Sequence, residues 1–313
     1  MPFRQTTVSG FPAIALRSEE LEVVVVPVLG MKLTNLRRLR GREWLWRNEQ
    51  IPLRLPKSGA SYQETADSGG WDECFPTVAE SPGLPDHGEL WSGDWSSSIY
   101  ESAGGTTLAG SVTGRARPYE LHRELTLDPV EPVVRLRYRL RHTGNQTFPW
   151  IWSAHPLLNV QRGTTLVLPT VTQVKLDAVH GRPDLARGDT VSWAGAVGGE
   201  PTRFVFPEQG DWALKAFADV GPSGRMILTD PRQDERLELV VRPDEVPQVG
   251  LWINCRGWAP PGKTPYYNLG LEPCIGAPDR LEDAIHEWGA AQFLQPGEER
   301  NWGVELWLPP TSS

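Results

Sequence analysis

Two histidines and one glutamate stand in segments that could support proton transfer. His155 ends the apolar segment WIWSAH, and the following Pro156 restricts it to an extended conformation, which fixes the direction of the imidazole. His87 lies among turn residues in LPDHGELW, where Gly88 permits a close backbone approach. Glu272 lies in the apolar segment YYNLGLEP, so its carboxylate should be partly desolvated, as suits a general base.

Each of these three residues also has a purely structural explanation. A histidine beside an apolar strand is often a core residue whose ring nitrogens are hydrogen-bonded. A buried glutamate such as Glu272 can belong to a structural salt bridge, for example with an arginine. The other histidines are interpreted as strand, loop or helix-flanking residues without a role in chemistry: His122, His142, His180 and His286.

The elements that would position these residues are mainly strands. Residues 133–142 alternate apolar and basic side chains, which predicts a strand with one face in the core. The β-branched run at residues 21–28 predicts a strand that is buried on both faces. Further strands are predicted at residues 35–39, 106–113, 121–127, 148–153, 165–168, 172–176, 204–206, 212–217, 226–229, 237–241, 249–254 and 301–308.

Helices are expected to be few and short. The 29 prolines and 31 glycines are spread along the chain, and both residue types interrupt long helices. One short helix is predicted at residues 280–284, with Asp279 as its N-cap, and residues 51–86 are predicted to be mostly loop. The sequence therefore predicts an all-β protein, a sandwich or barrel, with residues 1–313 forming a single domain.

Charge and composition argue against several kinds of partner. The net charge is −8, and basic residues cluster only at Arg37, Arg38 and Arg40, too few to follow a phosphate backbone, so nucleic acid is not expected. No segment approaches the ~20 apolar residues that cross a bilayer, and none has the pattern of a secretory signal. Three cysteines without paired spacing suggest reduced thiols and a cytoplasmic location.

Two other catalytic chemistries have weak support. The sequence His87-Gly88-Glu89 contains the HxE of zinc deaminases, but paired cysteines and a close histidine pair are missing. No GxSxG segment provides a serine nucleophile, and Cys74 has no obvious activating partner.

The order of three short motifs resembles the galactose mutarotase-like (aldose 1-epimerase) superfamily. An HG in a turn-rich loop is followed by an HP after an apolar strand and by a late LEP. SGGWDECFP at residues 68–76 is similar to the GG…FP segment of the hexose-epimerase branch, and a Pro-Gly-Glu turn precedes the last strand. The resemblance covers nearly the whole chain and implies a large antiparallel β-sandwich with an open cleft on one face.

The resemblance also implies an activity, the interconversion of the α and β anomers of an aldose. Glu272 would take the proton of the anomeric hydroxyl, and His155 would protonate the ring oxygen, so that the ring opens to the aldehyde. His87 would hydrogen-bond the ring-side oxygen. Reclosure after rotation about the first carbon–carbon bond gives the other anomer. This chemistry requires neither a metal nor a redox cofactor.

A small-molecule sugar is the expected partner. Eight residues are candidates to bind it: Trp71, Asp72, Glu73, Trp91, Trp152, Asn159, Trp252 and Asn254. The first three belong to the segment that would face the substrate, and its carboxylates favour a neutral sugar over a phosphorylated one. Two alternatives remain open: a non-catalytic sugar-binding or sugar-sensing module on the same fold, and an epimerase of a phosphorylated hexose. The identity of the sugar and the oligomeric state are not specified by the sequence.

Overall fold

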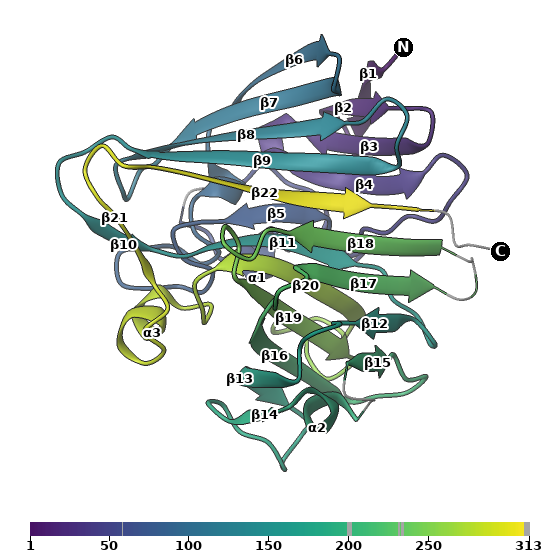
Figure 1. Cartoon of the computed structure of the whole chain (residues 1–313), viewed down its shortest axis with the longest axis vertical. Coiled ribbons are helices and arrows are strands. Elements are labelled where there is room, and N and C mark those ends of the chain that lie inside the picture. The colour runs from purple at the N-terminus through teal and green to yellow at the C-terminus, as the bar shows by residue number, and fades with distance from the viewer. Residues whose placement is uncertain (58, 199–201, 231, 233–234, 310–313) are drawn as a thin grey trace.

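Two large antiparallel sheets, one of 11 strands and one of nine, form the body of the structure, together with a two-stranded sheet. The computed structural model describes residues 1–57, 59–198, 202–230, 232 and 235–309. The two large sheets are stacked as layers (Figure 1). The predicted all-β sandwich with few short helices is confirmed.

The strands of the 11-stranded sheet, in spatial order, are β1 (Phe3–Val8), β2 (Phe11–Arg17), β3 (Leu21–Val26), β4 (Lys32–Arg38), β5 (Trp71–Cys74), β11 (Trp152–Leu158), β20 (Tyr267–Ile275), β19 (Gln248–Cys255), β16 (Trp212–Asp219), β13 (Gln173–His180) and β14 (Thr190–Ser192). Those of the nine-stranded sheet are β15 (Arg203–Val205), β12 (Thr165–Val167), β17 (Arg225–Asp230), β18 (Glu235–Val241), β22 (Glu299–Trp307), β9 (Val133–His142), β8 (Tyr119–Leu127), β7 (Gly105–Thr113) and β6 (Ser96–Ser102). The remaining elements are the paired strands β10 (Phe148–Trp150) and β21 (Gln292–Leu294), the helices α1 (Tyr62–Thr65), α2 (Trp193–Val197) and α3 (Leu281–His286), and the 3-10 turns η1 (Pro27–Leu29) and η2 (Leu90–Ser92).

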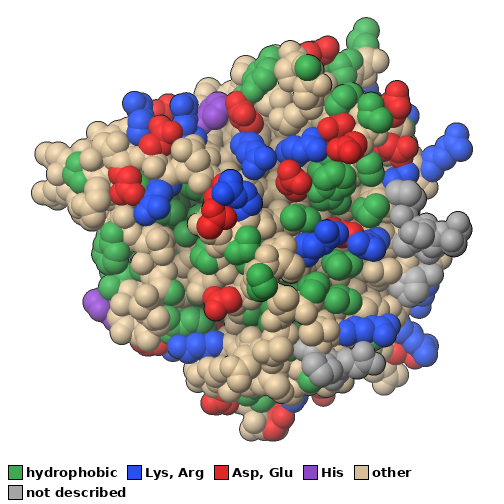
Figure 2. Space-filling model, in the orientation of Figure 1, with side chains coloured by type: hydrophobic (Ala, Val, Ile, Leu, Met, Phe, Trp, Pro, Cys, Tyr) green, Lys and Arg blue, Asp and Glu red, His purple; other side chains and the backbone are tan. Residues whose placement is uncertain are grey.

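Alternation along the strands decides which side chains enter the core. In β9, Leu136, Tyr138 and Leu140 are buried while the arginines between them face water, as the sequence predicted. The largest apolar cluster takes side chains from both large sheets, including the fully buried Trp71 and Trp152. On the face seen in Figure 2, acidic and basic side chains are interspersed. In the described part of the chain, no helix has the length and apolar character needed to cross a membrane.

Several predicted boundaries were wrong at prolines and in the long loop. The strand predicted at residues 148–153 is divided at Ile151, and β11 then continues through Pro156 to Leu158. The strand carrying Glu272 likewise continues through Pro273. Residues 51–86 contain α1 and β5, which their Gly, Pro and Ser content concealed.

Candidate active site

A cavity of about 260 Å³ lies over the half of the 11-stranded sheet that runs from β11 to β13. Its floor is formed by side chains from five strands that are consecutive in the sheet, β11, β20, β19, β16 and β13. Along these strands the cavity residues alternate with members of the main apolar cluster, so the cavity is on the face turned away from the core. Two residues of α1, Tyr62 and Gln63, and loop residues from 67–87, 258–266 and 279 complete the walls.

All three residues singled out for proton transfer line this one cavity. His155 comes from β11, Glu272 from β20, and His87 from the loop before η2. In the pairing of β11 with β20, Leu157 lies opposite Gly270. Because the strands are antiparallel, stepping back two residues on β11 and forward two on β20 brings His155 opposite Glu272. Both side chains then lie on the same face of the sheet as the cavity.

Glu272 lines the cavity, and the protein holds only one of its two carboxylate oxygens. Lys215 on β16 donates from Nζ to Oε2 at 2.5 Å. The other oxygen, Oε1, is buried and has no hydrogen-bond partner among the described residues. Two glycines leave room for this carboxylate, because a Cβ would lie 2.4 Å from Oε1 at Gly270 and 3.4 Å from Oε2 at Gly250. A carboxylate with one oxygen left without a partner can act as a base toward a bound ligand.

Lys215 also contacts a second carboxyl, that of Asp279, at 3.2 Å. The ammonium group is buried, which disfavours its charge, but Asp279 and Glu272 more than offset this effect and raise the pKa of Lys215. Burial raises the pKa of Asp279 to about 7, with Lys215 opposing the shift and Glu272 adding to it. Asp279 was predicted to be a helix N-cap, but α3 starts after Arg280 and the Asp279 side chain turns to Lys215 instead.

The backbone of His87 is held in an unusual conformation. Its φ is +59°, in the left-handed region that few non-glycine residues adopt outside functional sites and turns. The following Gly88 is required, because a Cβ there would lie 2.2 Å from the carbonyl oxygen of Phe75. The imidazole stacks on Tyr62 at 4.0 Å between ring centroids, and its Nδ1 lies 2.8 Å from a carboxylate oxygen of Asp86.

The two histidines differ in their affinity for a proton. Burial would lower the pKa of His87, but the Asp86 carboxylate outweighs burial and raises it. Burial lowers the pKa of His155 well below its usual value, and the charges of His87 and Lys215 lower it further. The rings meet edge to face with centroids 5.0 Å apart. In the free protein, therefore, the proton of this pair belongs on His87.

Two tryptophans contribute aromatic surface to the cavity. Trp252, one of the expected sugar-binding residues, lines the cavity and meets Trp258 edge to face at 5.4 Å between ring centroids. Asn254 does not line it. The Asn254 side chain instead accepts hydrogen bonds from the backbone of Gly257 and Trp258, and donates to the Trp258 carbonyl at 2.9 Å. Asn254 therefore shapes the turn that presents Trp258.

Three other expected sugar-binding residues lie in the core, which corrects that prediction. Trp71 and Glu73 belong to β5 and point to the face opposite the cavity, as does Trp152 of β11. Glu73 is fully buried and accepts hydrogen bonds from both tryptophans, from Arg123 and from Tyr138. These contacts saturate its carboxylate, so that none of it is available to a ligand.

The remaining three candidates do not line the cavity either, although two of them support its walls. Asp72 accepts a hydrogen bond from the hydroxyl of Tyr62, a wall residue, at 2.6 Å. Trp91 donates from Nε1 to the backbone carbonyl of the residue before His87 at 3.1 Å. Asn159 donates to two carbonyls of the segment 43–45, outside the cavity.

Sequence reasoning missed several residues of the cavity wall: Tyr62, Asp67, Asp177, His180, Lys215, Trp258, Tyr266 and Asp279. His180 was predicted to lie in a polar loop, whereas it ends β13. One signal was available in WALKAFAD, where Lys215 is the lone cation in an apolar strand and needs a buried partner.

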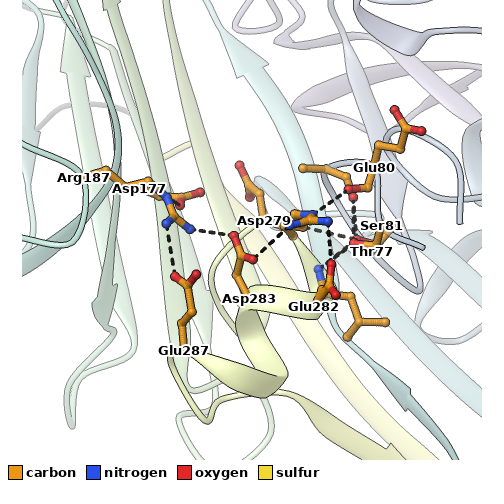
Figure 3. A network of polar contacts seen from close by, with 12 residues as sticks. Thr77, Glu80, Ser81, Asp177, Arg187, Asp279, Glu282, Asp283 and Glu287 are labelled. Atoms are coloured by element: carbon orange, nitrogen blue, oxygen red, sulfur yellow. Dashed lines mark hydrogen bonds and ion pairs between the residues drawn. The ribbon is translucent and has the colours of Figure 1, made fainter.

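An arginine joins the cavity-lining strand β13 to α3 (Figure 3). Arg187, from the loop after β13, contacts the wall residue Asp177 at 3.2 Å. It also reaches Asp283 of α3 at 2.6 Å and Glu287 just beyond α3 at 3.1 Å. The arginine thus ties β13 to α3 and balances the charge of Asp177.

Comparison with known proteins identifies the fold. No protein-family model matches the chain, and no curated protein matches it in sequence. A galactose mutarotase-like protein from Clostridium acetobutylicum is similar in structure, with 12% identity, a TM-score of 0.70, and 98% of each chain covered. A provisionally named aldose 1-epimerase from Escherichia coli K12 has 15% identity and a TM-score of 0.70 over 98% of this chain and 99% of that one. A galactose mutarotase related enzyme from Lactobacillus acidophilus has 15% identity and a TM-score of 0.68, over 96% and 98%. The expected resemblance is confirmed at the level of the fold.

Proposed function

We propose that the protein is an isomerase of the aldose 1-epimerase kind, which interconverts the α and β anomers of an aldose. The observation that carries this proposal is the convergence of His87, His155 and Glu272 on one small cavity, where one carboxylate oxygen of Glu272 has no hydrogen-bond partner among the described residues. The similar structures named as mutarotases and epimerases support the same class of reaction.

In the forward step, Oε1 of Glu272 accepts the proton of the anomeric hydroxyl. The electron pair of that O–H bond forms the carbonyl of the aldehyde as the bond from the first carbon to the ring oxygen breaks. The ring oxygen takes a proton from the histidine pair. After rotation about the first carbon–carbon bond, the sugar hydroxyl adds to the other face of the carbonyl. Both protons then return, so the site regains its starting state.

The acid function is assigned to His87 and His155 as a pair. Asp86 favours the imidazolium form of His87, which supplies the proton in the free enzyme. His155 stands opposite the base on the neighbouring strand, where a contact to the ring oxygen is geometrically suited. Proton-transfer groups of this kind contribute roughly 10²–10⁴-fold each, adequate for a reaction that already proceeds in water.

A neutral sugar fits the charge of the cavity better than a phosphorylated one. No arginine is among the described residues that line it, and its one lysine, Lys215, is engaged by two carboxylates. A phosphate group would need arginine or lysine side chains that are not already paired with carboxylates. The faces of Trp252 and Trp258 offer apolar surface for the C–H groups of a sugar ring.

Polarimetry on freshly dissolved α-glucose and α-galactose tests the proposal. The wild-type protein should accelerate the approach to the equilibrium rotation, and Glu272→Gln should not. Glu287→Gln, which alters an exposed carboxylate outside the cavity, is the matched control. If the wild type binds these sugars but leaves every tested aldose at its spontaneous rate, a non-catalytic sugar-binding function replaces the enzyme.

We propose in addition that residues 1–313 fold as one domain and act in the cytoplasm. The main apolar cluster is shared by both large sheets, which supports one folding unit. Three free, buried cysteines, Cys74, Cys255 and Cys274, are consistent with a reducing compartment.

A further inference from the structure

Two carboxyl groups of the cavity share one lysine, and the proposed reaction uses only one of them. Lys215 Nζ lies 2.5 Å from Glu272 and 3.2 Å from Asp279. All three side chains line the cavity, and Lys215 and Glu272 are almost completely buried. A buried group of charges is costly unless each member has a partner, so the second carboxyl calls for an explanation.

The backbone carbonyl of Asp279 accepts three hydrogen bonds from residues 77–79. Its carbonyl oxygen accepts hydrogen bonds from the backbone N–H of Val78 at 2.9 Å and of Ala79 at 2.8 Å. The hydroxyl of Thr77 donates to the same carbonyl oxygen at 3.3 Å, and Figure 3 shows Thr77 near Asp279. Because Val78 also lines the cavity, these bonds join Asp279 to another part of the cavity wall.

The Asp279 carboxyl is left half satisfied. Oδ2 faces Lys215, whereas Oδ1 is buried and has no hydrogen-bond partner among the described residues. Oε1 of Glu272 is in the same condition. Buried acceptors without a donor destabilise a protein, and they are expected where a ligand supplies the missing donor.

We propose that Asp279 is a further substrate-contacting carboxyl of this site and that Lys215 is the positioning residue that aligns it with Glu272. The identity of the ligand as a sugar rests on the proposed function. Lys215 holds the two carboxyls side by side, so that one oxygen of each accepts a hydroxyl donor. Glu272 receives the anomeric hydroxyl, and Asp279 receives another hydroxyl of the same ring. Since Asp279 would bind only where a hydroxyl is present, it would also select the sugar.

Binding measurements separate this proposal from the catalytic one. Calorimetry with glucose, galactose and their monodeoxy derivatives is carried out on the wild type and on Asp279→Asn. The variant should bind the preferred sugar about tenfold or more weakly, the usual effect of losing a hydrogen bond to a charged group. One monodeoxy sugar should bind to the wild type about as weakly as the preferred sugar binds to the variant. The variant should bind that monodeoxy sugar no more weakly than it binds the preferred sugar. Asp283→Asn, a nearby carboxylate that contacts Arg187 outside the cavity, should bind like the wild type.

The role of Lys215 is tested by measuring kcat and KM separately for two variants. Lys215→Met frees both carboxyls, so kcat should fall together with affinity, while Lys215→Arg should restore part of both. Circular dichroism and the melting temperature establish that each variant is folded. If Asp279→Asn does not fold, Asp279→Glu is measured in the same way, and the displaced carboxyl should again weaken the same sugar contact.

The possible results have distinct meanings. Equal affinities of the wild type and Asp279→Asn for every sugar in the panel overturn the role of Asp279, even when the enzyme is active. If Asp279→Asn shows the expected loss of affinity but the wild type binds sugar without turnover, the role of Asp279 stands and the epimerase is overturned. Absence of binding to any sugar in the panel overturns both.

Discussion

Gly270 leaves open the carboxylate oxygen of Glu272 on which the proposed chemistry depends. The two residues are two positions apart on β20, so they face the same side of the sheet. A Cβ at position 270 would lie 2.4 Å from Oε1 of Glu272, closer than real Cβ contacts come. The glycine matters to the site, because its missing side chain leaves the space that Oε1 of Glu272 itself occupies.

Replacing Gly270 by alanine should therefore damage activity more than folding. The end of the Glu272 side chain can move away from the added methyl group, but displacement of a reacting group by about 1 Å can reduce the rate about a hundredfold. Polarimetric kcat/KM values give the measurement. Gly104→Ala is the control, since a Cβ there meets nothing nearer than 3.6 Å. Equal activity of both variants would show that Glu272 needs no such space.

Glu272→Gln keeps the shape of the side chain and removes the base. Its kcat should fall by roughly 10²–10⁴-fold, the contribution of one acid–base group, while KM changes little. Lys215 retains Asp279 as a partner, so the variant should stay folded. A variant with near-normal kcat would mean that another group is the base.

Glu73 should contribute to stability and not to sugar binding. It forms a fully buried ion pair with Arg123 at 3.1 Å in the core. Glu73→Gln leaves that arginine without its counter-charge, so the free energy of unfolding should fall by about 3–5 kcal/mol. Urea denaturation measures this change, with the exposed Glu101→Gln as a control. A raised KM without a loss of stability would restore Glu73 to the binding site.

The proton of the histidine pair predicts a specific pH dependence. Activity that needs the His87 imidazolium is present below its raised pKa and is lost as the pH rises through that pKa. Asp86→Asn removes the main stabilising charge, so the alkaline limb of kcat/KM should move to lower pH, with the carboxyls of Asp67 and Asp279 still in place. An unmoved limb would place the essential proton elsewhere, for example on His155.

The fold could be predicted where alternation was strong. The strand at residues 133–142 was predicted with the bounds of β9, because every second side chain is apolar. The four-residue strand β5 shows no such period, and its flanking glycines suggested a loop. Without the strand, the sequence could not reveal that Trp71 and Glu73 face the core while Asp72 faces the other side.

The candidate site was predictable only in part, for a related reason. His87, His155 and Glu272 each stand in a distinctive local segment, whereas the pairing of Lys215 with Asp279 depends on contacts between residues far apart in the chain. Those contacts exist because β16, β19 and β20 are neighbours in the sheet, an arrangement that no local pattern encodes. The turn residue Asp279 was therefore interpreted as a helix cap.

A crystal structure of the Glu272→Gln variant with its preferred aldose bound would test most directly whether the three residues act on one anomeric centre. The anomeric oxygen should lie about 2.6–3.2 Å from the side chain at position 272, with the ring oxygen turned toward His155 and His87. A sugar seated outside this cavity, or with its first carbon directed away from Glu272, would contradict the proposed epimerase.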